Sequence, residues 1–180
     1  MLKKLRESQK GFTLIELLIV IALTGIISTA AAVSIHQVIT GTTLSNNQNT
    51  AINQVRNAGY WISRDALMAE NIHVGDNPET FLTINWTKYN YNGGDDEYHA
   101  IVYSLEDISG DRIGKLKRTH YVGIPSTEQA FIADHIYYNP DESNTTSANY
   151  TSPVLTVQIT AKTEDATETR EYEITRRPTF

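Results

Sequence analysis

One carboxylate interrupts an otherwise apolar run near the start of the chain. Glu16 lies within KGFTLIELLIVI, residues 10–21, and no further Asp, Glu, Lys or Arg occurs before Arg56. Placing such a charge inside a bilayer costs about 2.5–3.5 kcal/mol. A carboxylate at this position therefore indicates a function that needs the charge, and a buried carboxylate requires a cation as its partner.

A second group of carboxylates follows a glycine pair, in the order Gly93-Gly94-Asp95-Asp96-Glu97. Carboxylate oxygens can bind Ca²⁺ in a loop, but this order lacks the Asp-x-Asp-x-Asp-Gly pattern of an EF-hand. We therefore favour a solvated hairpin tip and predict no cofactor, with Ca²⁺ at Asp95, Asp96 and Glu97 as the alternative.

The remaining reactive side chains show no catalytic or metal-binding pattern. The five histidines lack metal-ligand spacing, and they are His36, His73, His99, His120 and His135. The chain has no Gly-x-Ser-x-Gly, no phosphate loop and no His-Glu-x-x-His, the arrangements that position a nucleophile, a phosphate or a zinc ion. The sequence thus predicts a protein that is not an enzyme and has no metal site.

Charge is distributed unevenly along the chain. The first ten residues carry Lys3, Lys4, Arg6 and Lys10 against the single acid Glu7, whereas residues 37–180 hold eleven Lys or Arg and nineteen Asp or Glu, a net charge of −8. A basic start before an apolar segment is a membrane-targeting layout, with the basic end in the cytoplasm. The acidic remainder would repel phosphate, so no nucleic-acid partner is predicted.

Two stretches with helical character follow the basic start. Residues 13–35 supply about 23 mostly apolar residues, enough to span a bilayer. An apolar stripe with steps of three and four comes next, formed by Ile52, Val55, Gly59, Ile62, Ala66 and Ala69. We predict one long helix over residues 13–72, with a break near Gly41 left open, ending before Gly75 and Asn77-Pro78.

After Pro78 the apolar period changes to two, which indicates strands. Six are predicted, at 80–86, 98–105, 115–122, 131–138, 154–161 and 169–175, with the first two and the last two paired as hairpins. Residues 139–152 are predicted to be a polar loop. Because one sheet face is apolar, the stripe at 52–69 must cover it, which gives an α+β fold: a long N-terminal helix, transmembrane in its first half and amphipathic in its second, packed on an antiparallel head.

Two ordinary explanations leave Glu16 unaccounted for. A secretory signal peptide would have the basic start, and small residues near 30–32 could form its cleavage site. A single-pass anchor would have the same apolar run. Neither needs a carboxylate in that run, and the apolar run continues into a helical pattern where a signal peptide would end.

The segment from Gly11 to Glu16, with the apolar run through Ile35, resembles the type IV pilin and type II secretion pseudopilin superfamily. The resemblance implies that a prepilin peptidase cuts between Gly11 and Phe12 and methylates the new amino terminus of Phe12. It also implies that Glu16 pairs with the Phe12 ammonium of a neighbouring subunit. The implied partners are the peptidase, other pilin or pseudopilin subunits, an inner-membrane assembly platform and, before assembly, the membrane.

The implied pilin-like organisation has four parts. Residues 1–11 form a cleaved cytoplasmic leader, 12–36 a transmembrane or filament-core helix, 37–75 an amphipathic helix and 76–180 a β-rich head. The implied location is the cytoplasmic membrane, as a single-pass protein with the head outside, and then a periplasmic or cell-surface filament.

The head resembles the J-type minor pseudopilins more weakly. The residues concerned are Val102-Tyr103-Ser104-Leu105 and Leu116-Lys117-Arg118, followed by FIADHIYY at 131–138. Two departures argue against a major pilin: Val33 stands where many pilins have a proline, and the chain has no cysteine for a C-terminal disulfide. A minor pseudopilin is favoured; a type IV pilus subunit for adhesion, motility or DNA uptake, and a signal-anchored extracytoplasmic binding protein, are the alternatives.

Overall fold

The structure is a computed structural model, and it describes residues 11–123 and 126–176. The chain divides into two compact units, residues 1–43 and 44–180, which are taken separately below. Residues 1–10 of the predicted leader lie outside the described residues.

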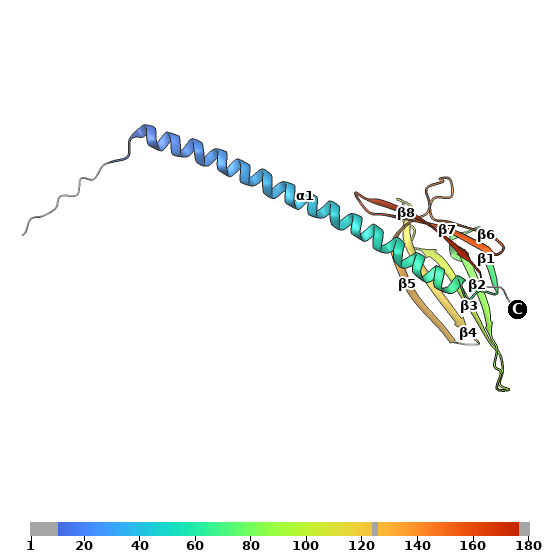
Figure 1. Ribbon diagram of the computed structural model, residues 1–180. Helices are drawn as coiled ribbons and strands as arrows, with labels where there is room; N and C mark the ends of the chain where they lie inside the picture. The colour runs from blue at the N-terminus through green and yellow to red at the C-terminus, as the bar shows by residue number, and fades with distance from the viewer. Residues whose placement is uncertain (1–10, 124–125, 177–180) are drawn as a thin grey trace, which may run out of the picture. The chain divides into compact units, whose positions relative to one another are not determined.

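A single helix, α1, is assigned from Leu14 to Ala66 (Figure 1). The residues on both sides of Gly41 are helical, so the helix break considered near Gly41 is not observed. The predicted end at residue 72 is wrong. After Ala66 the amides of Met68 and Ala69 bond to carbonyls only three residues back, which tightens the turn, and the amide of Glu70 donates to Asn85 of a strand.

The part of α1 in the first unit has an apolar surface and satisfied hydroxyls. Its Leu, Ile and Val side chains are exposed along the whole length. Thr24, Thr29 and Ser34 each donate to the carbonyl four residues earlier, at 2.7, 2.8 and 2.9 Å. These hydroxyls therefore need no water, which suits an apolar environment.

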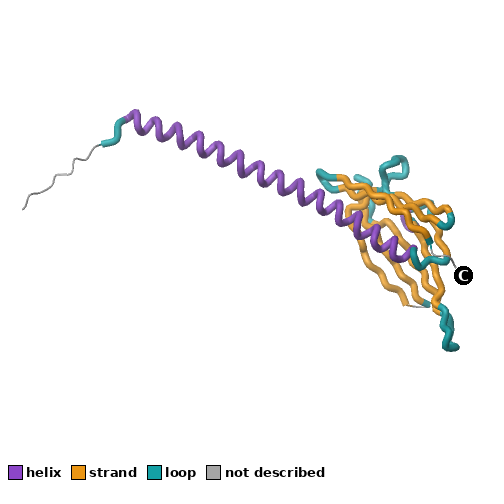
Figure 2. The backbone as a smooth tube through the Cα atoms, in the orientation of Figure 1, coloured by secondary structure: helices purple, strands orange, loops and turns teal. Residues whose placement is uncertain are grey.

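The second unit contains the end of α1, a short 3₁₀ helix η1 (Pro78–Thr80) and eight strands, and the strands lie against residues 44–66 of α1 (Figures 1 and 2). The strands are β1 (Asn71–Val74), β2 (Leu82–Lys88), β3 (Glu97–Glu106), β4 (Ile113–Val122), β5 (Ser126–Tyr137), β6 (Ser147–Thr151), β7 (Val154–Lys162) and β8 (Thr167–Thr175). Their order is β1-β2-β3-β4-β5-β7-β6, with β8 on the other edge of β7, and every pairing is antiparallel. The α+β, pilin-like fold class is confirmed.

All six predicted strands are present, and both predicted hairpins are confirmed. Two strands were not predicted. β1 begins at Asn71, within the predicted helix at 13–72, and β6 lies within the predicted polar loop at 139–152. In β6 only Ala148 and Tyr150 pack on the core, so the apolar alternation is too short and too polar to stand out.

The core of the second unit lies between α1 and the sheet. The helix buries one stripe, formed by Ala51, Val55, Ala58, Gly59, Ile62, Asp65 and Ala66. The predicted phase of this stripe is confirmed, although Ile52 is only partly buried and Ala51 takes its place. From the sheet, Leu82, Ile84, Ile101, Leu116 and Ile136 are fully buried against it.

At Gly59, α1 lies directly against a side chain of β8. A Cβ at this position would overlap the ring of Tyr172 on β8. The Tyr172 hydroxyl donates to the carbonyl of Val55 at 3.1 Å, which holds the ring in this place. Only glycine therefore allows β8 to lie this close to the helix.

Candidate functional site

Three residues precede the first turn of α1, and they include the predicted processing site. Gly11, Phe12 and Thr13 are outside the helix and exposed, with Phe12 at 85%. No described atom lies within 4 Å of the position that a Cβ on Gly11 would take. The packing of this chain therefore does not require a glycine there, so any requirement must come from a molecule that binds the segment.

Glu16 and Thr13 cap the start of α1 reciprocally. The Thr13 amide donates to Glu16 Oε2 at 3.0 Å, and the Thr13 hydroxyl donates to the same oxygen at 2.8 Å. In return the Glu16 amide donates to Thr13 Oγ1 at 3.3 Å. This is a capping box, which satisfies amide groups that the first helical turn leaves unpaired.

The capping box gives Glu16 a second role that the sequence analysis did not predict. Within residues 11–123 and 126–176, the hydrogen bonds to the Glu16 carboxylate come from Thr13. The signal was available, because Thr-x-x-Glu before an apolar run is the pattern of a capping box. The predicted pairing of Glu16 with the Phe12 ammonium of another subunit stays a prediction.

The apolar surface behind Glu16 has no cover among the described residues. Its exposed side chains include Leu14, Ile15, Leu18, Ile21 and Ile26. By length and composition α1 is able to cross a membrane, and none of its most apolar window is buried. Such a surface needs either lipid or other helices around it.

In the second unit, a buried carboxylate joins the end of α1 to the sheet. Asp65 is fully buried, and Arg118 of β4 reaches it with two donors, Nε to Oδ2 at 2.7 Å and Nη2 to Oδ1 at 3.2 Å. The Tyr103 hydroxyl of β3 donates to Oδ2 at 2.5 Å. The Arg118 guanidinium also lies 5.1 Å from the ring centre of Trp61. We call these three residues, Asp65, Tyr103 and Arg118, the Asp65 cluster.

The electrostatics of the Asp65 cluster are those of a fixed structural ion pair. Burial, followed by the nearby Asp65 carboxylate, raises the pKa of Tyr103 well above its usual range. The phenol therefore stays protonated and acts as a donor. The Asp65 carboxylate is buried and accepts hydrogen bonds from Tyr103 and Arg118. These bonds hold α1 against β3 and β4, and they leave the carboxylate inaccessible to a ligand at the surface.

Tyr103 and Arg118 lie in two of the segments that carry the resemblance to J-type pseudopilins, but the sequence predicted no contact between either residue and Asp65. The structure brings all three together. Asp65 lies on α1, 38 residues from Tyr103 and 53 from Arg118. Because these separations exceed any helical or strand period, no local pattern could have paired them.

The loop between β2 and β3 contains Asp95 and Asp96, and Glu97 begins β3. This loop projects beyond the neighbouring strand ends (Figure 2). Asp96 accepts from the Asn90 amide at 2.9 Å, and Glu97 pairs with Lys88 at 3.2 Å. The hydrogen bond from Lys88 lowers the pKa of Glu97. In the part of the chain that the structure describes, no three His, Asp or Glu side chains converge to hold a metal. Ca²⁺ binding at Asp95, Asp96 and Glu97 stays an untested alternative.

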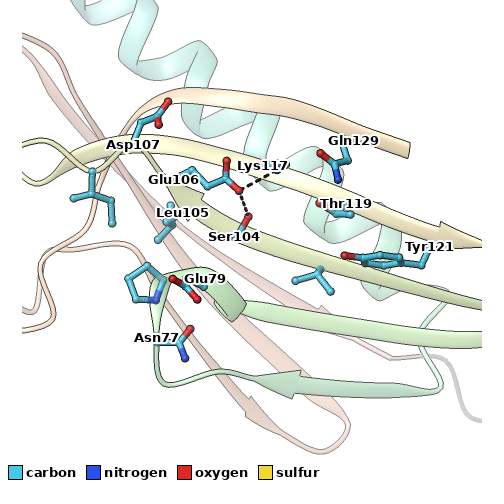
Figure 3. A pocket seen from close by; sticks show the side chains of 13 residues that line it. Asn77, Glu79, Ser104, Leu105, Glu106, Asp107, Lys117, Thr119, Tyr121 and Gln129 are labelled. Atoms are coloured by element: carbon cyan, nitrogen blue, oxygen red, sulfur yellow. Dashed lines mark hydrogen bonds and ion pairs between the residues drawn. The ribbon is translucent and has the colours of Figure 1, made fainter. Parts of the chain in front are cut away.

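A polar groove crosses the sheet face that points away from α1 (Figure 3). It is lined by alternate residues of β3, β4 and β5 and by η1, among them Ser104, Glu106, Lys117, Thr119 and Gln129. Lys117 Nζ lies 3.0 Å from Glu106 Oε1, and the Ser104 hydroxyl donates to the same oxygen at 3.4 Å. Glu106 and Lys117 are thus paired with each other, and the lining contains no histidine that could serve Ser104 as a base.

Of the five histidines, the structure brings two together, His99 on β3 and His120 on β4, with Nδ1 and Nε2 3.0 Å apart. Sequence spacing did not reveal the pair, because its contact depends on strand register. His36 lies on α1, His73 on β1 and His135 on β5.

Comparison with known proteins gives one match. Residues 6–32 match the family model described as the prokaryotic N-terminal methylation motif, a range that includes Gly11, Phe12 and Glu16. This match supports an amino-terminal segment of the type IV pilin and pseudopilin kind. No curated protein and no solved structure matches the chain.

Proposed function

We propose that the chain is a structural subunit of a type IV pilus-like or type II secretion pseudopilus filament. The observation that carries this proposal is the match of residues 6–32 to the methylation motif, a range that includes Gly11, Phe12 and Glu16. The exposed apolar surface of α1 fits the same role, because it would be covered first by lipid and then by the helices of neighbouring subunits.

The proposed pathway begins at Gly11. The prepilin peptidase cuts after this residue and methylates the new amino terminus of Phe12. In the membrane, the Thr13 amide and hydroxyl satisfy the Glu16 carboxylate. In the filament, the Phe12 ammonium of a neighbouring subunit neutralises it. Only one axial offset between subunits would satisfy both charges, so the pair would fix the register of assembly.

Within this class we propose a minor, J-like pseudopilin at or near the filament tip. The head is β-rich and has no cysteine, and Tyr103 and Arg118, which lie in two segments that carry the resemblance, both bind Asp65. A type IV pilus subunit is the second candidate. A signal-anchored binding protein with an extracytoplasmic head is the candidate from another class.

The proposed location and partners follow from the same role. The chain would be a single-pass protein of the cytoplasmic membrane with its head outside, and later part of a periplasmic or cell-surface filament. Its partners would be the peptidase, other pilin or pseudopilin subunits and the assembly platform. Its role would be structural, not enzymatic.

Mass spectrometry of the mature amino terminus tests this proposal. Expression with and without a prepilin peptidase should yield, respectively, N-methyl-Phe12 and an uncut chain. An intact Met1 in the presence of an active peptidase, or a cut near Ala32, would contradict the filament role. The copy number of the chain in sheared filaments would then separate a major from a minor subunit.

A further inference from the structure

His99 and His120 meet edge to edge across β3 and β4. Their ring planes differ by 21° and their centres lie 5.2 Å apart, whereas His99 Nδ1 and His120 Nε2 are separated by 3.0 Å. Two bare nitrogens would repel at this distance, and so would two N–H groups. The contact therefore holds a single proton, which one ring donates to the other.

The outer nitrogen of each ring faces a carboxylate. His99 Nε2 lies 3.4 Å from Glu97 Oε2, and His120 Nδ1 lies 3.9 Å from Glu128 Oε2. The four side chains thus form a row across β3, β4 and β5. When both rings are neutral, they share two protons: one occupies the central contact and one an outer nitrogen, so only one of the two outer nitrogens carries an N–H that faces a carboxylate.

The environment of the pair is aromatic and only slightly exposed. Trp86 of β2 stacks on His99 with ring centres 5.0 Å apart, and it lies 5.7 Å from His120. The histidine side chains are 12% and 16% exposed. The other charged groups that act on the pair are Arg118 on β4 and Asp65 on α1, while Lys88 is bound to Glu97.

We propose that His99 and His120 form a proton-sharing pair that makes this end of the sheet sensitive to pH. The first added proton goes to the remaining outer nitrogen, so that each outer nitrogen carries an N–H that faces a carboxylate. A second added proton places N–H groups on both sides of the central contact, which separates the rings and releases Trp86. The proposal does not depend on the role of the chain in a filament.

The charges around the pair oppose full protonation. Burial, then Arg118 and His99, lower the pKa of His120, while Glu128 and Asp65 act in the other direction. Because the two rings interact directly, their protonation is coupled.

The two tryptophans make a direct test practical. In Trp61→Phe, Trp86 is the only tryptophan of the chain, and a protonated imidazole quenches the fluorescence of an indole stacked on it. The full-length chain in detergent micelles is titrated from about pH 8 to about pH 4. We expect a two-step change in Trp86 fluorescence, reduced to one step by His99→Gln or by His120→Gln. The controls His73→Gln and His135→Gln should leave both steps in place.

Circular dichroism shows whether each histidine variant folds. If one does not, a variant at the surface still tests the proposal. Glu128 is exposed, and Glu128→Gln removes one flanking charge without disturbing the core. It should move the fluorescence midpoints to lower pH, by about half a unit, whereas the exposed control Glu164→Gln should not. A single step that is insensitive to Glu128→Gln, or one unchanged by either histidine variant, would overturn the proposal.

Discussion

Tyr103 and Arg118 lie directly opposite each other on β3 and β4, and both donate to the same carboxylate, Asp65 on α1. Opposed residues of an antiparallel pair project from the same face of the sheet, which explains how two strands deliver one donor each to a single buried acid. Tyr103 of β3 and Arg118 of β4 thus have a shared physical role: together they anchor the end of α1 to the sheet.

Arg118→Met should lower the free energy of unfolding of the head by about 3–5 kcal/mol, because Asp65 would remain buried without its cation. Urea unfolding of the full-length chain in detergent, followed by near-ultraviolet circular dichroism, measures this loss. Arg56→Met is a matched control on an exposed position of α1 and should change stability by less than about 0.5 kcal/mol. The double variant Asp65→Leu/Arg118→Met should be more stable than Arg118→Met alone, and strict additivity would refute a direct ion pair.

Tyr103→Phe should cost about 1.5–3 kcal/mol, the usual worth of a hydrogen bond to a charged group. The ring remains in place, so the packing of the core does not change. The loss should nearly vanish in the Asp65→Leu background, because the acceptor is then absent. An equal loss in both backgrounds would mean that the hydroxyl acts through another group.

Gly59→Ala should destabilise the head by about 1–3 kcal/mol, because the added methyl group overlaps the Tyr172 ring. Gly41→Ala is the matched control: this glycine is also helical, no atom lies within 4 Å of its missing Cβ, and alanine should gain up to about 1 kcal/mol of helix stability. In a Tyr172→Leu background the cost of Gly59→Ala should fall. A cost that is independent of residue 172 would assign the effect to the helix alone.

Two variants of Glu16 separate its charge from its role in the capping box. Glu16→Gln keeps an oxygen that can accept from Thr13, whereas Glu16→Ala keeps neither the acceptor nor the charge. If Glu16 pairs with the Phe12 ammonium of a neighbour, both variants should be processed at Gly11 and both should be deficient in sheared filaments.

Thr13→Val is the complementary control, because it removes the hydroxyl and leaves the charge. It should reduce incorporation less than Glu16→Gln does. Normal incorporation of Glu16→Gln together with failure of Glu16→Ala would show that the cap matters and the charge does not. Normal incorporation of both variants would refute a role for Glu16 in assembly.

The sequence predicted the elements whose residues alternate regularly, and it failed where a contact depends on distant partners. The stripe from Val55 to Ala66 and both hairpins follow from local periodicity, and they are confirmed. β1 and β6 are strands because β2 and β7 pair with them; their own alternation covers only four and five residues. For the same reason, neither the Asp65 cluster nor the histidine pair could be found before the register of β3 and β4 was known.

The stability of the head should increase with pH on the acidic side of the ordinary histidine pKa of about 6.5 and level off above it. Burial lowers the pKa of His120 in the folded state, so the unfolded chain binds more protons in this range. The contribution of His120 is therefore complete above the unfolded value of about 6.5 and is lost as the pH falls through the lower, folded value. Glu97, whose pKa is also lowered in the folded state, contributes in the same direction but only at more acidic pH.

Urea midpoints measured across the range should rise with pH, and the slope should be smaller in His120→Gln than in His135→Gln. A flat profile, or one with the same slope in both variants, would show that His120 titrates alike in the folded and unfolded chains.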